Sequence, residues 1–119
     1  MKKIAILSAL LLSITFSCKN ETKLDAEYLN GNWLVQEAFR NEIKTQTLAG
    51  ANFNFNNNFI NTNFTGKDVN SSLVINHKTK SLRLEALNQE FITKIISDKQ
   101  LELSTTIQGI PFRIIIIKQ

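Results

Sequence analysis

Residues that carry most catalytic and metal chemistry are scarce in this sequence. It contains one cysteine, Cys18, and one histidine, His77, together with one proline and four glycines. A single cysteine cannot form an intramolecular disulfide, and a zinc site built from Cys and His needs about four ligands. A catalytic triad would depend on His77, which stands beside Lys78 in a polar segment typical of an exposed turn. We therefore predict no metal, no cofactor and no enzymatic activity.

A strong excess of charge of either sign is also lacking. The 119 residues include 14 basic and 10 acidic side chains, a formal net charge of +4, and loss of Lys2 and Lys3 would lower it to +2. So small an excess, with no cluster of Lys or Arg, is a poor match to a phosphate backbone, and we predict no nucleic-acid partner. The length fits one domain, and an apolar fraction of 43% is typical of a globular chain.

The N-terminus has the pattern of an export signal. Lys2 and Lys3 precede an apolar run over residues 4–16. A helix that spans a bilayer needs about 20 apolar residues, so this run is too short to span but suits the core of a secretory signal. We expect residues 1–17 to be a cleaved signal peptide.

The junction Thr15-Phe16-Ser17-Cys18 resembles the lipobox of bacterial lipoproteins. Thr15 and Phe16 depart from that family's pattern, which prefers Leu and a small residue at these places. The resemblance implies cleavage before Cys18, attachment of a diacylglycerol to its thiol and acylation of the new amine. Two other readings are an ordinary cleaved signal followed by a stray cysteine, and an uncleaved anchor.

Lipidation of Cys18 would place the chain in the cell envelope with the membrane as a partner. Residues 18–23 are polar and short, as expected of a tether. Lys19-Asn20 lacks the acidic patch that some export systems read for the cell exterior. We therefore expect an outer-membrane lipoprotein on the periplasmic face, with the folded domain covering residues 24–119.

Beyond the tether, the dominant hydrophobic period is two, as in half-buried strands. Phe53 and Phe55, for example, alternate with asparagines. The expected strands cover residues 32–39, 51–56, 58–64, 69–76, 81–87, 90–97, 100–107 and 110–118. Their short connections require antiparallel neighbours, and eight such strands close most simply into an all-β, up-and-down barrel. The count is eight or nine, because residues 43–48 also have a strand-like pattern.

In two of the expected strands, some residues do not fit a pattern with one apolar, buried face and one polar, exposed face. Strict alternation would turn Glu37 inward with Trp33, although a β-bulge could turn it out. Residues 114–117 are four isoleucines, so this strand is apolar on both faces. Its outer face needs cover, either from the chain segment around Leu24 and Tyr28 or from a partner.

The segment Gly31-Asn32-Trp33, which opens the first strand after a short helical lead, resembles the lipocalin signature, and the bacterial lipocalin-like lipoproteins in particular. The resemblance covers about residues 28–118, although the family's Thr-Asp-Tyr motif is missing. It implies that Gly31 allows close backbone approach, that Trp33 plugs the barrel base, and that Arg113 packs across Trp33. Small barrels of the META type are an alternative reading of the same pattern.

Five phenylalanines have the spacing expected of interior positions and are the candidate ligand-binding residues: Phe53, Phe55, Phe64, Phe91 and Phe112. An eight-stranded barrel is just wide enough either to be filled by side chains or to hold one small ligand, and both outcomes stay open. We expect a membrane-anchored, non-catalytic, lipocalin-like lipoprotein that binds a small apolar ligand. The alternative is an envelope interaction or inhibitor module that uses the barrel surface to bind a protein.

Overall fold

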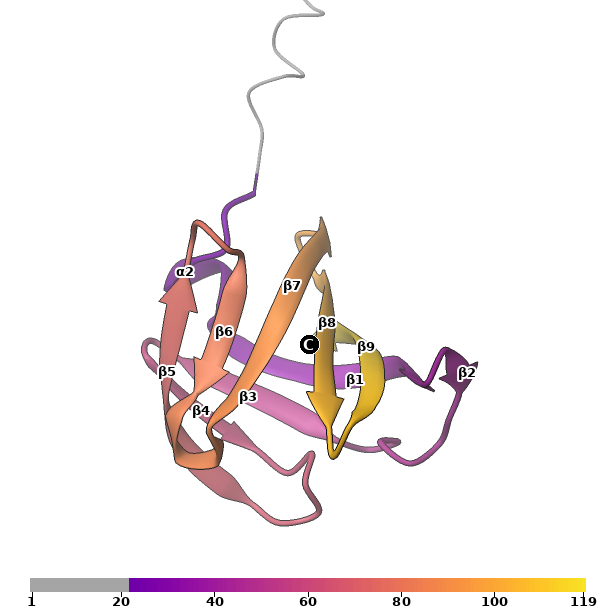
Figure 1. Ribbon diagram of the computed structural model, residues 1–119. Helices are drawn as coiled ribbons and strands as arrows, with labels where there is room; N and C mark the ends of the chain where they lie inside the picture. Colours follow the sequence, from indigo (N-terminus) through magenta and orange to yellow (C-terminus); the bar gives the residue numbers. More distant parts are fainter. Residues whose placement is uncertain (1–21) are drawn as a thin grey trace, which may run out of the picture.

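The computed structural model describes residues 22–119 (Figure 1), so the predicted signal peptide and Cys18 lie outside the described residues. Within them the chain forms one α-helix, α2 (Ala26–Leu29), one 3-10 turn, η2 (Glu85–Leu87), and nine strands. The strands are β1 (Gly31–Arg40), β2 (Ile43–Lys44), β3 (Asn52–Asn56), β4 (Phe59–Thr62), β5 (Val69–Asn76), β6 (Ser81–Leu84), β7 (Gln89–Ser97), β8 (Gln100–Ile107) and β9 (Ile110–Lys118).

The strands close into an antiparallel up-and-down barrel. Neighbours in the chain pair in sequence from β3 to β9, β3 also pairs with β1, and β1 closes the ring on β9. β2 is an extra strand that adds only a short hairpin to β1. The predicted eight-stranded barrel is confirmed, and the possible ninth strand over residues 43–48 is reduced to Ile43–Lys44.

Local turn chemistry explains most strand ends. Asn57, between β3 and β4, has a φ of 57°, as expected of a residue that tolerates the left-handed region. The predicted strand over residues 81–87 was too long: β6 ends at Leu84, η2 follows, and Asn88 closes the turn with a φ of 49°.

The two ends of the barrel differ, and we name them here. The base is the end where β1 begins and β9 ends; the turns β3–β4, β5–β6 and β7–β8 lie there. The mouth is the opposite end, formed by η2, the β8–β9 turn and the longer connections over residues 45–51 and 63–68. α2 precedes β1 and covers the base (Figure 1).

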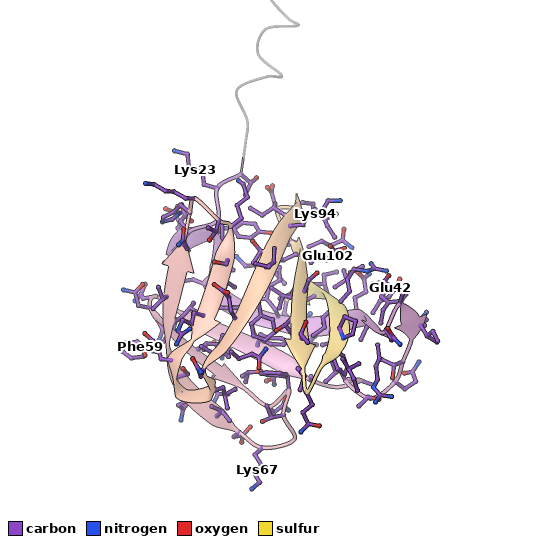
Figure 2. All side chains as sticks on the ribbon, in the orientation of Figure 1. Lys23, Glu42, Phe59, Lys67, Lys94 and Glu102 are labelled. Atoms are coloured by element: carbon purple, nitrogen blue, oxygen red, sulfur yellow. The ribbon has the colours of Figure 1, made fainter. Side chains whose placement is uncertain are left out.

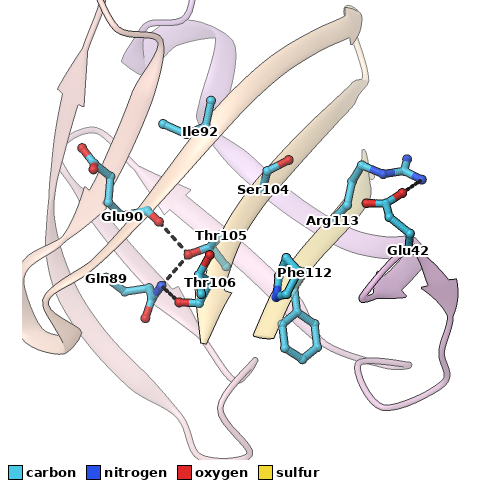
Figure 3. A pocket seen from close by; sticks show the side chains of 10 residues that line it. Glu42, Gln89, Glu90, Ile92, Ser104, Thr105, Thr106, Phe112 and Arg113 are labelled. Carbon is cyan, nitrogen blue, oxygen red and sulfur yellow. Dashed lines mark hydrogen bonds and ion pairs between the residues drawn. The ribbon is translucent and has the colours of Figure 1, made fainter. Parts of the chain in front are cut away.

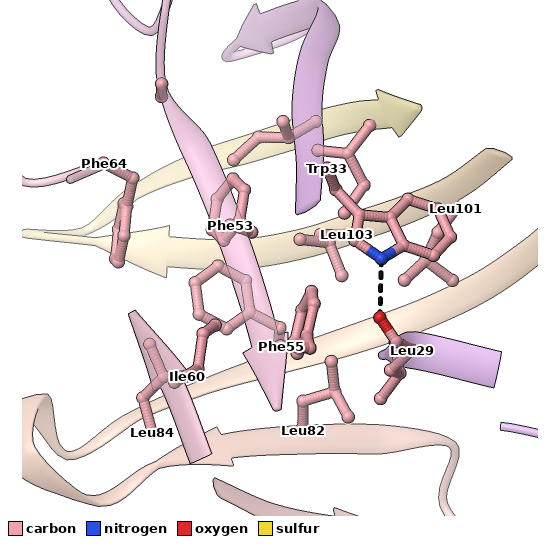
Figure 4. Close-up of a cluster of buried hydrophobic side chains, with 14 of the residues drawn as sticks. Leu29, Trp33, Phe53, Phe55, Ile60, Phe64, Leu82, Leu84, Leu101 and Leu103 are labelled. Carbon is pink, nitrogen blue, oxygen red and sulfur yellow. Dashed lines mark hydrogen bonds between the residues drawn. The ribbon is translucent and has the colours of Figure 1, made fainter. Parts of the chain in front are cut away.

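Large apolar side chains fill the barrel interior (Figure 4). Strands such as β3, β5 and β7 alternate buried and more exposed residues, as predicted, and the asparagines of β3 take the outward positions. A few inward positions are polar, such as Thr62, Thr93 and Thr105, and each hydroxyl donates to a backbone carbonyl of a neighbouring segment at 2.7 or 2.8 Å. Among the described residues no buried side-chain polar atom lacks a partner, so these hydroxyls add little cost.

A β-bulge in β1 settles the orientation of Glu37. Val35 faces Ile116 and Glu37 faces Ile115, so Gln36 is the extra residue on β1. The bulge shifts the alternation, and Ala38 becomes the buried residue while Glu37 stays partly exposed. The bulge considered as the alternative in the sequence is therefore present, and strict alternation from Trp33 does not extend to the second half of this strand.

The isoleucine run of β9 divides between two environments. Ile114 and Ile116 are fully buried inside the barrel, whereas Ile115 and Ile117 face outward and are half-buried. Side chains from the two flanking strands cross over this outer face. The Gln100 amide of β8 donates to the Gln36 side chain of β1 at 2.8 Å, and β9 lies between them. Intramolecular contacts thus give the outer isoleucines partial cover.

Candidate functional site

Trp33 closes the base of the barrel. Its side chain is 0% exposed, and its indole nitrogen donates to the backbone oxygen of Leu29 at 2.7 Å (Figure 4). The rings of Tyr28 and Phe55 pack on it with centroids at 5.5 and 6.4 Å. The plug predicted at this position is therefore present, and α2 fixes it through a backbone acceptor that satisfies the buried N–H.

The cation over Trp33 is Lys118, and the expectation for Arg113 is wrong. The Lys118 ammonium lies 5.3 Å from the Trp33 ring centroid and donates to the Tyr28 backbone oxygen at 2.6 Å. Lys118 pairs with Trp33 across β1 and β9, whereas Arg113 lies on the outer face of β9, nearer the mouth. A cation–π contact of this kind is worth about 0.5–2 kcal/mol.

Arg113 instead joins β9 to the β1–β2 hairpin on the outside of the barrel. Its guanidinium lies 4.1 Å from the Phe39 ring centroid and forms ion pairs with Glu42 at 3.2 Å and Glu102 at 3.4 Å. The hydrogen bond to Glu42 is the main cause that raises the pKa of Arg113 further above its ordinary value. This is a surface network, so we assign it a small contribution to stability.

Gly31 has a different role from the one expected. A Cβ at this position would meet only the Lys118 side chain, at an ordinary contact distance of 3.5 Å. Its φ of 131° is, however, a conformation that other residues rarely adopt. Gly31 therefore allows the backbone to turn from α2 into β1 just before Trp33.

Tyr28 closes the base from outside Trp33. Its hydroxyl lies 2.8 Å from the carbonyl oxygen of Ser97 and 3.1 Å from that of Gln100, so it bridges the β7–β8 turn. Burial disfavours the phenolate, and the nearby Asp98 carboxylate repels it. Together they raise the pKa of Tyr28 from 10.0 to about 12.

The five candidate phenylalanines separate into two groups. Phe53, Phe55 and Phe91 are at most 2% exposed and belong to the packed interior, so they are not surfaces that a ligand can reach. Phe64 stacks on Phe53 at 5.8 Å and meets Phe91 edge to face at 5.5 Å. The middle of the barrel is thus filled by aromatic rings, and only Phe64 and Phe112 reach a pocket at the mouth.

That mouth pocket has a volume of about 360 Å³, which is within the usual range for small-molecule sites. Its apolar lining comes from five side chains on separate segments: Leu48, Phe64, Leu87, Ile107 and Phe112. Its polar lining consists of uncharged side chains: Thr47, Thr65, Gln89 and Gln108. The chemistry of this lining suits a neutral apolar molecule with a few hydrogen-bonding groups.

Gln89 is held in place at the pocket edge. Its side-chain amide contacts the Thr105 hydroxyl and donates to the Thr106 backbone oxygen at 3.2 Å (Figure 3). The Thr105 hydroxyl in turn donates to the Glu90 backbone oxygen at 2.7 Å. This chain of contacts holds the Gln89 amide in a fixed orientation at the edge of the pocket.

Several pocket residues were missed in the sequence because they lie in connections. Leu48 belongs to the long link between β2 and β3, and Leu87 to η2, so neither follows a strand alternation. In the sequence, only Leu48 gave any indication of burial, because it is a large apolar residue that follows a polar stretch. The packing of these two residues over the mouth depends on the closed barrel.

A second, wider groove lies on the outer face of β7, β8 and β9 (Figure 3). Its volume is about 490 Å³, and its lining includes Ile92, which is 51% exposed, and the Glu42–Arg113 ion pair. It presents an apolar centre beside paired charges.

His77 is exposed in the β5–β6 turn, as expected. Residues 22–119 bring together no group of three or more His, Cys, Asp or Glu side chains that could hold a metal ion.

No helix within this described part of the chain is long and apolar enough to cross a membrane.

Comparison with known proteins gives no relative. No known family matches the chain, and neither a curated protein nor a solved structure matches it. The barrel architecture is established, whereas the resemblance to lipocalin-like lipoproteins stays a prediction.

Proposed function

We propose that this protein is a membrane-anchored, non-catalytic lipoprotein whose barrel mouth binds a small, neutral, apolar molecule. The lipobox-like junction at Cys18 supports the anchor in the cell envelope. The observation that carries the binding function is the uncharged pocket of about 360 Å³ above a filled aromatic core. Because the base is closed by Trp33, the mouth is the end open to a ligand.

Leu87 offers a sharp test of this site. Leu87 is half-buried in η2 and lines the pocket, whereas its neighbour Ala86 is exposed on the same turn. Leu87→Glu places a charge in the uncharged pocket and should weaken binding of a neutral apolar probe, N-phenyl-1-naphthylamine, by about tenfold or more. Ala86→Glu adds the same charge outside the pocket and should leave binding unchanged.

The measurement is a fluorescence titration of the chain that begins at Lys19, which removes the signal and the anchor. The buried core cluster starts at Leu24, so this chain keeps it intact. Extraction of the same purified protein, followed by mass spectrometry, identifies any natural ligand. Equal probe binding by the two variants, or no saturable binding by the parent, would reject the mouth as a ligand site.

The second candidate function is binding of an envelope protein on the outer face. The observation in its favour is the groove over β7, β8 and β9, with exposed Ile92 beside the Glu42–Arg113 pair. Crosslinking of the parent protein in its native membrane, followed by mass spectrometry, should identify one envelope protein bound to it. Ile92→Glu should abolish this crosslink and leave probe binding at the mouth unchanged. A ligand-free protein with an Ile92-dependent partner would favour this function over the first.

A further inference from the structure

Charge is distributed unequally between the two ends of the barrel. In the described residues, the helical lead, the base turns and the C-terminal end carry five lysines, Lys23, Lys78, Lys80, Lys99 and Lys118, against three acids, Asp25, Glu27 and Asp98. The mouth segments, together with the β1–β2 hairpin at the same end, carry three basic residues, Arg40, Lys44 and Lys67, against three acids, Glu42, Asp68 and Glu85. The positive excess therefore lies at the base, where the chain enters the barrel.

A groove of about 510 Å³ opens at this same end, beside β7. β7 continues toward the base beyond its last pair with β6, Ser81 with Ile92, so residues 94–97 have no β6 partner (Figure 1). Exposed Lys80 and Lys94 line the groove, and Ile96, which is 46% exposed, lies among its apolar residues. Two lysines and an exposed isoleucine in one groove suit a phosphate head group and its glycerol backbone.

The N-terminal segment lies against this groove. Thr22 and Leu24 line it, and the Thr22 hydroxyl is 3.3 Å from the Asp98 carboxylate. Figure 2 shows Lys23 and Lys94 at the same end of the molecule. Cys18 precedes Thr22 by four residues, a stretch that can span at most about 14 Å. Even this maximum reach is less than twice the Debye length of about 8 Å at physiological ionic strength, so an anchored base would lie close enough to sense lipid charge.

We propose that the groove lined by Lys80, Lys94 and Ile96 binds the head group of an anionic phospholipid in the membrane that holds the anchor. The inference rests on the proposed lipid anchor at Cys18. The base then lies on the bilayer, and the mouth faces away from it. A ligand of the mouth pocket would therefore exchange with the aqueous phase.

The reactivity of lysine side chains provides the test, because each end of the barrel carries lysines whose labelling rates report how accessible that end is. The full lipidated protein is reconstituted in vesicles of phosphatidylcholine alone or with phosphatidylglycerol, treated with a membrane-impermeant amine-reactive reagent, and mapped by mass spectrometry. Lys78, Lys80, Lys94 and Lys99 should react about threefold or more slowly in the anionic vesicles, whereas Lys44 and Lys67 should react equally in both. Equal rates for the base lysines in the two lipids would overturn the proposal.

Charge-reversal variants distinguish binding of lipid at the groove from a general electrostatic attraction of the whole protein to anionic vesicles. Lys80→Glu with Lys94→Glu should remove the protection of Lys78 and Lys99 in anionic vesicles. Lys44→Glu with Lys67→Glu makes the same change in net charge at the mouth and should leave that protection intact. All four substituted side chains are exposed, so both proteins should fold. Loss of protection in both double variants would show that no specific groove is involved.

The anchor and the groove fail in different ways. The intact mass of the membrane-extracted protein reports whether Cys18 carries acyl chains. A protein without acyl chains would contradict the proposed anchor, and the labelling experiment with added vesicles would then still test the groove alone. An acylated protein with unprotected base lysines would keep the anchor and reject the groove.

Discussion

At the residue scale, the base of the barrel depends on one indole. Trp33 is completely buried, satisfies its N–H through Leu29, and has Tyr28, Phe55 and Lys118 around it. These contacts explain why a single large residue can close this end. Lys118 supplies the cation from the last strand and ties it to the helical lead through the Tyr28 backbone oxygen.

Trp33→Ala should destabilise the fold by about 3–5 kcal/mol, because it leaves a large cavity and removes a satisfied hydrogen bond. Urea unfolding followed by circular dichroism measures this loss. Ile92→Ala, at an exposed apolar position, should change the free energy of unfolding by no more than about 0.5 kcal/mol. A loss near zero for the Trp33 variant would mean that the indole does not support the core.

Tyr28 predicts a loss of stability in alkali. Its folded pKa of about 12 exceeds the ordinary 10.0, so the unfolded chain loses the proton first as the pH rises. The stabilisation is complete below pH 10 and disappears as the pH passes through about 12. Unfolding of the parent should therefore become easier between pH 8 and pH 11 by more than that of Tyr28→Phe. An identical pH slope in the two proteins would contradict this role of Tyr28.

At the element scale, the β1 bulge reconciles a regular strand with a charged residue. Gln36 takes up the extra position, so Val35 and Ala38 both face the interior while Glu37 stays outside. The bulge also aligns Gln36 with Gln100 over the outer face of β9. The short β1–β2 hairpin beyond it positions Glu42 against Arg113.

Deletion of Gln36 should leave the barrel folded, because the shortened strand keeps Val35 and Ala38 inward and Glu37 outward without a bulge. Deletion of Glu102 from β8, a strand whose pairing with β9 is regular, should prevent folding, because it reverses the faces of every residue on one side of the deletion. Thermal unfolding of both proteins measures the contrast. If the two deletions destabilise equally, Gln36 is not the extra residue.

At the scale of the whole molecule, closure of β1 on β9 leaves only the short β2 as a sheet edge and separates a plugged base from an open mouth. The two proposals divide between these ends: a ligand at the mouth and a membrane surface at the base. Both follow from the same arrangement, in which the N-terminal segment and the C-terminal end of β9 meet at the base.

Cys18→Ala should release the protein from the membrane fraction, because the acyl chains need the thiol and no second cysteine is present. Fractionation of cells that express the parent and the variant measures this, with the Lys44→Glu and Lys67→Glu protein as a control that keeps the anchor. Persistent membrane association of the alanine variant would contradict lipidation at this residue.

Alternation of apolar side chains was enough to predict the class of fold, the order of the strands and most of their ends, because each strand must bury one face and pair with its neighbours locally. The packing at the barrel ends was not predictable in this way. The contact of Lys118 with Trp33 and the meeting of Leu48, Leu87 and Phe112 at the mouth depend on segments far apart in the chain, as does the choice of Gln36 as the extra residue of the bulge. Their positions follow from barrel closure, which sets the register between β1 and β9. This register cannot be predicted from the hydrophobic periodicity of either strand, because it depends on how the two strands pair with each other.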